Sequence, residues 1–174
     1  ARLTEGLQTG DFEKRYLTVL CGTPDPERGT LTNYLRKNTV NNLVYICTQT
    51  EEGAKFASLD YKVLESKGKY SLAEVRLHTG RTHQIRVHMK YIGHTLFNDE
   101  RYGGHDILKG TTFTKYKQFV QNCFAICPRQ ALHAKTLGFV HPTTGEEMFF
   151  DSEIPSDMQQ LIDRWRVYAN TKEL

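Results

Sequence analysis

Thr79–His88 reads TGRTHQIRVH and joins two stretches of different periodicity. Before it, apolar and charged residues alternate across Leu72–Leu77, which predicts a strand with one face toward water. After its first residues, apolar side chains recur every three or four positions, which predicts a helix over Thr82–Tyr91 that ends at Gly93. The stretch therefore lies where a strand passes into a helix, and backbone N–H groups at such a junction favour anions.

The remaining sequence predicts further strands and helices around this junction. Alternating or β-rich segments predict strands at Tyr16–Leu20, Leu43–Thr48, Leu59–Leu64, Thr136–Val140 and Glu147–Asp151. Helical spacing predicts helices at Leu31–Leu35, at Tyr116–Cys123 and after Ser156. Hairpins interleaved with helices indicate an α+β fold class, with a largely antiparallel mixed sheet and flanking helices. A length of 174 residues fits one domain.

The composition of the chain restricts its partners. The net charge is +3, but Lys62–Lys90 holds seven basic and two acidic residues, whereas Glu146–Leu174 holds seven acidic and three basic ones. A basic stretch of this kind predicts contact with an anion, and nucleic acid is the commonest large one. No apolar run approaches the ~20 residues of a membrane span. Four cysteines without a secretory leader predict free thiols, so we expect a cytoplasmic protein with no membrane partner.

The side chains of the junction limit the chemistry it can perform. His83 and Arg86 are three residues apart and share one helical face, while the apolar residues take another. The arginine fork suits a carboxylate or a phosphate because it donates two hydrogen bonds at once. A salt-bridged surface helix would use the same residues. His83 and His88 are five apart, unlike the four-residue spacing of a helical zinc pair, so we expect no metal site.

Longer stretches of the chain resemble one family closely. Thr79–His88 is followed by IGHTLFNDERYGG at Ile92–Gly104, and together they resemble the late motif of the RluA-type RNA pseudouridine synthases. EKRYL at Glu13–Leu17 is similar to that family's K-x-Y strand. RQALHA at Arg129–Ala134 and HPTTGE at His141–Glu146 are similar to its closing hairpin. The resemblance implies the family's catalytic-domain fold and the isomerisation of uridine to pseudouridine in structured ribosomal or transfer RNA, without a cofactor.

The same resemblance implies roles for individual residues. Tyr16 is expected to be the active-site tyrosine that packs against a uridine flipped out of the RNA stack. Arg86 is expected to pair with the catalytic aspartate, keeping it ionised and oriented. RNA-facing or supporting roles are expected for Arg81, His83, Lys14, Arg15 and Lys90.

One motif of the family has no counterpart in this sequence. The family's nucleophilic aspartate lies in an H-R-L-D-x-x-T-S-G motif upstream of the K-x-Y strand, and no segment before Tyr16 resembles it. We therefore expect residues 1–174 to be the C-terminal part of a single catalytic domain, incomplete at its N-terminus and inactive alone. Strands missing from the sheet would leave an exposed edge, which favours self-association.

Two other functions are compatible with parts of the sequence. A non-catalytic RNA-binding module derived from the family predicts RNA affinity that falls steeply with salt. A metal-dependent enzyme built on the histidine-rich junction predicts stoichiometric metal, although the spacing of the histidines argues against it.

The resemblance also departs from the family pattern next to Asp99. Asn98 stands where the family prefers a glycine. Asparagine tolerates the left-handed backbone conformation that such a glycine adopts. We therefore expect Asn98 to be left-handed.

Overall fold

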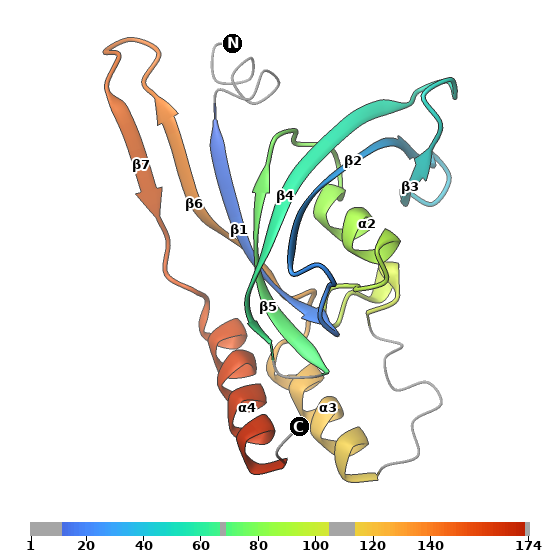
Figure 1. The fold of residues 1–174 in the computed structure, drawn as a ribbon, viewed down its shortest axis with the longest axis vertical. Helices are drawn as coiled ribbons and strands as arrows, with labels where there is room; N and C mark the ends of the chain where they lie inside the picture. Colours follow the sequence, from blue (N-terminus) through green and yellow to red (C-terminus); the bar gives the residue numbers. More distant parts are fainter. Residues whose placement is uncertain (1–11, 67–68, 105–113, 173–174) are drawn as a thin grey trace.

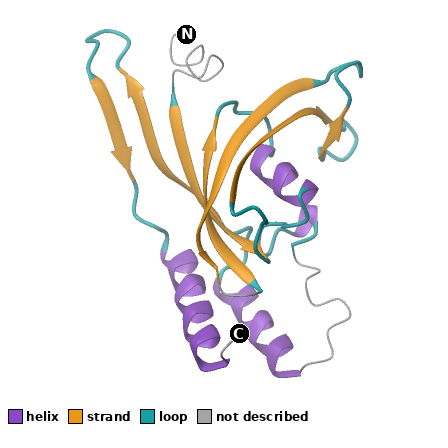
Figure 2. Ribbon diagram, in the orientation of Figure 1, coloured by secondary structure: helices purple, strands orange, loops and turns teal. Residues whose placement is uncertain are grey.

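The computed structural model describes residues 12–66, 69–104 and 114–172. The strands of this part form one sheet in the order β3-β2-β4-β5-β1-β6-β7, and every neighbouring pair is antiparallel (Figure 2). The strands are β1 (Glu13–Cys21), β2 (Arg28–Lys37), β3 (Val44–Cys47), β4 (Lys55–Ser66), β5 (Tyr70–Leu77), β6 (Leu132–Val140) and β7 (Glu147–Asp151). The predicted α+β fold with a largely antiparallel sheet is confirmed.

Helices accompany the sheet at two places. They are α2 (Gln84–Tyr91), the short η1 (Glu100–Tyr102), α3 (Thr114–Ile126) and α4 (Ser156–Lys172). Figure 1 shows α3 and α4 together at one end, whereas α2 lies beside the curved part of the sheet that β2, β3 and β4 form. The predicted junction helix begins two residues later than expected and ends before Gly93, whose φ is 86°. None of the described helices has the length and apolar character needed to span a membrane.

Both faces of the sheet carry a buried core. Leu17 and Val19 of β1 pack on the side of α3 and α4, together with Trp165. Leu20 packs on the opposite side, in the cluster that contains Ile85 of α2. Successive residues of a strand face opposite sides of a sheet, so the buried run at the end of β1 marks a strand that is covered on both faces.

The predicted helix at Leu31–Leu35 is wrong, because this segment belongs to strand β2. Leu31 and Leu35 are four residues apart, a spacing that places side chains on one face of a helix and equally on one face of a strand. In the structure both leucines pack in cores on the α2 side. Pairing of β2 with β4 along eight residue pairs decides between the two periods.

The sheet has two outer strands in the described part of the chain, β3 and β7. The β6–β7 hairpin extends away from the body of the molecule, on the far side from β3 (Figure 1). Phe149 on β7 is 70% exposed and Phe150 is 53% exposed. The hairpin therefore presents large apolar side chains to solvent beside a sheet edge.

Candidate functional site

A cavity of about 230 Å³ lies where the central strands meet the start of α2. Its lining combines residues from distant parts of the chain, namely Tyr16, Leu77, Arg81, His83, Gln84, Ile85, Arg86, Gln130 and Leu132. Four of the residues singled out in the sequence, Tyr16, Arg81, His83 and Arg86, thus share one cavity. Small-ligand sites commonly span about 300–1,000 Å³, so this cavity has room for a single aromatic ring system rather than several.

Tyr16 reaches the cavity from the middle of the sheet. It is half-buried on β1, between Val75 of β5 and Ala134 of β6. The register between β1 and β6 shifts between Arg15 and Tyr16, and such irregularities re-aim side chains beside functional sites. Burial raises the pKa of the Tyr16 hydroxyl, so the phenol stays neutral at physiological pH.

Arg86 is held in place by Asp99. The guanidinium donates from Nε to Oδ2 at 2.7 Å and from Nη2 to Oδ1 at 2.8 Å. The Arg86 side chain is 11% exposed and the Asp99 side chain is fully buried. These hydrogen bonds raise the pKa of Arg86 further, so the group is permanently charged. Arg86 also lines the cavity, and the N–H groups that Asp99 leaves unused are the ones available to a ligand there.

The turn that carries Asp99 is fixed by its backbone. Asn98 has a φ of 58°, so the expected left-handed conformation is confirmed, and its side-chain amide donates to the carbonyl of Cys127 at 2.9 Å. Gly104 closes the turn by donating its N–H to the Asp99 carbonyl at 2.7 Å. A Cβ at Gly104 would lie 1.8 Å from the carbonyl oxygen of Leu96, so only glycine fits.

His83 contacts Tyr102 at the entrance to α2. It lies outside the helix in a left-handed conformation, with φ 53°, and the Nδ1 atom is 2.8 Å from the Tyr102 hydroxyl. That hydroxyl accepts the N–H of Val44 at 2.9 Å, which leaves its proton for Nδ1. Burial, and then the charge of Arg86, lower the pKa of His83. The arrangement favours a neutral imidazole that carries its proton on Nε2.

Gln84 organises the Thr79–Arg81 turn, a role that no sequence pattern predicted. Its Oε1 accepts from Thr79 Oγ1 at 2.7 Å and from the Arg81 backbone N–H at 3.0 Å. Its Nε2 donates to the carbonyl of Ser58 at 2.9 Å. The buried amide therefore links the turn to β4 and fixes the position of the Arg81 backbone.

Apart from Arg81, the other predicted RNA-facing residues do not line the cavity. Arg81 does line it, with Nε donating to the carbonyl of Phe56 at 2.8 Å. Arg15 forms ion pairs with Glu13 and Glu74. Lys90 is exposed, with its ammonium 6.0 Å from the centre of the Tyr102 ring. Lys14 and Tyr16 are two residues apart on β1 and share one face of the strand.

Comparison with known proteins places the chain in a family. The family model described as RNA pseudouridylate synthase matches residues 1–91. Over 174 residues the chain is 42% identical to an uncharacterized RNA pseudouridine synthase of Chlorobaculum parvum, covering 99% of this chain and 53% of that protein. The chain belongs to the RluA-type RNA pseudouridine synthases. It is also 37% identical over 155 residues to ribosomal large subunit pseudouridine synthase D of Zymomonas mobilis, covering 86% of this chain and 44% of that protein.

A solved structure shows the same fold as this pseudouridine synthase chain. Human RNA Pseudouridylate Synthase Domain Containing 4 matches with a TM-score of 0.74 at 20% identity, over 95% of this chain and 66% of that one. The chain spans about half the length of the curated relatives it matches. The predicted roles of Tyr16 and Arg86 are therefore proposals about the function of the whole protein.

Proposed function

We propose that the protein isomerises uridine to pseudouridine in RNA, using the cavity between Tyr16 and Arg86 to hold the flipped base. The observation that carries this proposal is the convergence of Tyr16, Arg86, Arg81 and His83 on one cavity in a chain of this family. The cavity suits a single base, and a base must leave the RNA stack before an enzyme can act on it.

The reaction exchanges one bond of the nucleoside for another. The bond from N1 of uracil to C1′ of ribose breaks, a bond from C5 to C1′ forms, C5 loses its hydrogen and N1 gains a proton. A neutral Tyr16 ring gives the base a surface on which to pack while it is detached and turned. Arg86, rigidly held by Asp99, presents fixed donors to the anionic group that acts on the sugar–base unit.

The proposed nucleophile is not among the described residues that line the cavity. No acidic side chain lines the cavity among the described residues. We propose that the aspartate of an H-R-L-D-x-x-T-S-G motif enters it beside Arg86, and that residues 1–174 act as the C-terminal part of one catalytic domain. The 174-residue chain by itself is then expected to bind RNA without isomerising uridine.

The proposed substrate is structured ribosomal or transfer RNA in the cytoplasm. The name of the Zymomonas mobilis relative, a ribosomal large subunit pseudouridine synthase, supports ribosomal RNA. The proposed RNA-facing side chains are Arg81, His83, Lys14, Arg15 and Lys90, all around the cavity or on the adjoining strand and helix. The Arg15 guanidinium would have to exchange its two carboxylate partners for a phosphate.

Self-association through the β7 edge belongs to the same proposal. An outer strand with exposed Phe149 and Phe150 is a template for pairing with another copy. Sedimentation velocity of the 174-residue chain should show an apparent mass that rises with concentration, and Phe149→Lys should reduce that rise. Val40→Lys, at another highly exposed apolar residue, is the matched control. A chain that stays monomeric at all concentrations contradicts this part.

Tritium release from RNA tritiated at C5 of uridine tests the reaction, because C5 loses its hydrogen in every turnover. Two proteins are compared, the 174-residue chain and a version that also carries the aspartate motif upstream. We expect release by the longer protein only. Release by the 174-residue chain would contradict the proposed source of the nucleophile. RNA binding without release by either protein would favour the non-catalytic RNA-binding module.

A further inference from the structure

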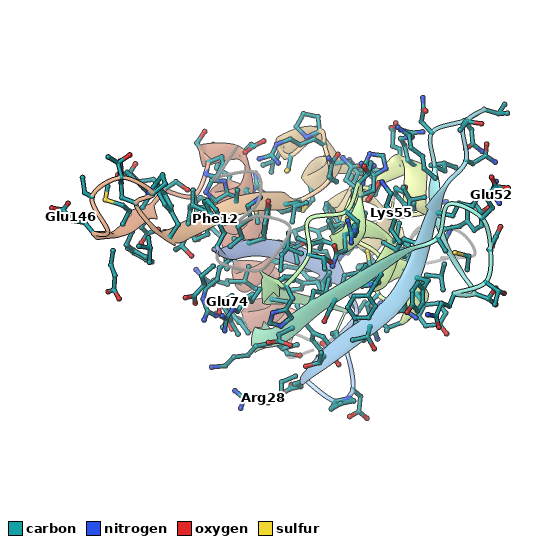
Figure 3. All side chains as sticks on the ribbon, turned by 90° about the horizontal axis from the view of Figure 1, so that it is seen from above. Phe12, Arg28, Glu52, Lys55, Glu74 and Glu146 are labelled. Atoms are coloured by element: carbon teal, nitrogen blue, oxygen red, sulfur yellow. The ribbon has the colours of Figure 1, made fainter. Side chains whose placement is uncertain are left out.

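A second, larger cavity adjoins the first one. It has a volume of about 510 Å³ and lies between the β2–β3–β4 part of the sheet and the Gly80–Thr82 turn. Arg81 lines both cavities, so they are neighbours across a single side chain. In Figure 3, Glu52, which lines this cavity, lies at the opposite end of the molecule from Glu146 of the β6–β7 turn, and Lys55, also in the lining, lies between them on the side of Glu52. The second cavity thus continues the first one away from that hairpin.

The charges around the second cavity are mainly positive. The basic residues that line it are Arg36, Lys37, Lys55 and Arg81, against Glu52 as an acidic residue. Lys37 and Lys55 are exposed, and in the described part of the chain neither forms an ion pair. A cavity with two unpaired ammonium groups and a guanidinium favours an anion with several oxygen atoms, such as a phosphate diester.

The strand register places the two lysines on the face that α2 covers. Lys55 pairs directly with Leu35, and Leu35 is buried in the cluster that contains Val87 of α2. Lys37 lies two residues beyond Leu35 on β2 and therefore on the same face. Arg36, between them in the sequence, also lines the cavity, but its guanidinium is paired with Glu51 at 2.9 Å. Among these three residues, Lys37 and Lys55 are therefore the cations that form no ion pair in the described part of the chain.

The positive charge extends to the first cavity. The charges of Arg86, Arg101 and Lys37 all contribute to lowering the pKa of His83, after burial. Lys37 therefore acts electrostatically on a residue that lines the first cavity. The positive charge of Lys37 would therefore also attract a polyanion that binds at His83.

The geometry points to the second cavity as a binding site for the RNA backbone, one that holds the phosphate of a nucleotide adjacent to the flipped uridine through Lys37, Lys55 and Arg81. This inference rests on the proposed function, since the first cavity is taken to hold the uridine. Its occupant is the phosphodiester chain and not the base, because the distinguishing groups of the lining are cations. The site would fix the direction in which the RNA leaves the first cavity.

Salt-dependent RNA binding tests the second cavity directly. The 174-residue chain is titrated against a labelled stem-loop RNA with one uridine in its loop, between about 50 and 200 mM salt. Each lost phosphate contact lowers the slope of log Kd against log salt by about 0.7–0.9. We therefore expect Lys37→Gln with Lys55→Gln to lower it by about 0.7–0.9, because both lysines hold the same phosphate. Lys62→Gln is the control, since Lys62 is exposed on the same strand as Lys55 but on its opposite face.

A neutral methylphosphonate next to the loop uridine locates the contact. It should weaken binding to the wild-type chain and have a much smaller effect on binding to the lysine double variant, in which only Arg81 still holds that phosphate. An unchanged salt slope in the double variant, or an equal loss in Lys62→Gln, overturns the inference. Tritium release is read separately. It is measured on the version that carries the aspartate motif: release there with an unchanged slope refutes the second cavity alone, and a lowered slope without release there refutes the proposed function alone.

Discussion

The two faces of the sheet are stabilised by different interactions. On the face of α3 and α4, Trp165 is buried and stacks on Tyr70 with ring centres 4.3 Å apart, and burial raises the pKa of the Cys123 thiol to about 12. On the face of α2, the fully buried groups include Asp99, and a buried Gln84 forms three hydrogen bonds. The α3–α4 face is therefore held mainly by apolar area, whereas the α2 face adds directed polar contacts to its apolar core.

This difference separates stability from positioning. Apolar burial contributes about 25 cal/mol per Å² whatever the orientation of the partner, so the α3–α4 face tolerates small rearrangements. Buried polar groups contribute only when donor and acceptor meet in the correct geometry, so the α2 face fixes the orientation of each member. The residues lining the first cavity come from the α2 face, and a site that must orient a ligand needs that rigidity.

Loss of Arg86 should have the largest effect on stability. Arg86→Ala leaves the carboxylate of Asp99 buried without its cation, which should lower the free energy of unfolding by about 3–5 kcal/mol. Urea unfolding measures this. Arg166→Ala on α4 is the matched control. Arg166 donates hydrogen bonds from Nε and Nη2 to Glu65, as Arg86 does to Asp99, but its side chain is 42% exposed. That pair should contribute about 1 kcal/mol or less. Equal losses in the two variants would refute the contrast between the faces.

Acid should destabilise the α2 face through His88. This side chain is fully buried, and within the described residues neither ring nitrogen has a hydrogen-bond partner. Burial lowers its pKa to about 4, whereas an unfolded histidine titrates near ~6.5. The unfolded chain therefore binds one more proton between these values, and stability falls as pH falls through this window.

The total loss from His88 should approach about 3 kcal/mol at pH 4 relative to pH 7. Urea unfolding across this pH range, for wild type and for His88→Leu, isolates the contribution. The variant should lose less stability on acidification than wild type does. Parallel pH profiles for the two proteins would show that His88 is not the titrating group.

A smaller effect is expected from Tyr102→Phe. The change removes the hydroxyl shared by His83 and the Val44 N–H, which should lower the free energy of unfolding by about 1–2 kcal/mol. It should also raise the pKa of His83, because the neutral imidazole loses a donor. An NMR titration of His83 measures the shift, with Tyr45→Phe, an exposed tyrosine bonded to Glu51, as control. An unchanged pKa in Tyr102→Phe would contradict the assigned hydrogen bond.

Local patterns in the sequence predicted the junction well. The strand over Leu72–Leu77, the helix after it and the left-handed Asn98 depend on neighbouring residues, and the structure has all three. The family resemblance brought Tyr16 and Arg86 to attention, and both line one cavity. These features follow from periodicity and motif order because they need no knowledge of distant contacts.

The remaining features depend on distances that spacing cannot supply. Asp99 is thirteen residues from Arg86, and only the turn closed by Gly104 brings them within 2.7 Å. In the sequence, Gln84 resembles any other polar residue of a helix. Its role depends on Ser58 of β4, which only the fold places beside it. The helix predicted over Leu31–Leu35 is wrong for the same reason, since its pairing partners lie 20 to 28 residues away on β4.

The most direct test of the account is turnover by Tyr16→Ala. The measurement is tritium release from RNA tritiated at C5 of uridine, in the version of the protein that carries the aspartate motif, with Tyr45→Ala as control. If the first cavity holds the flipped uridine against Tyr16, Tyr16→Ala should release tritium at least about 100-fold more slowly, while Tyr45→Ala keeps the wild-type rate. Turnover by Tyr16→Ala near the wild-type rate would contradict the assignment of this cavity as the active site.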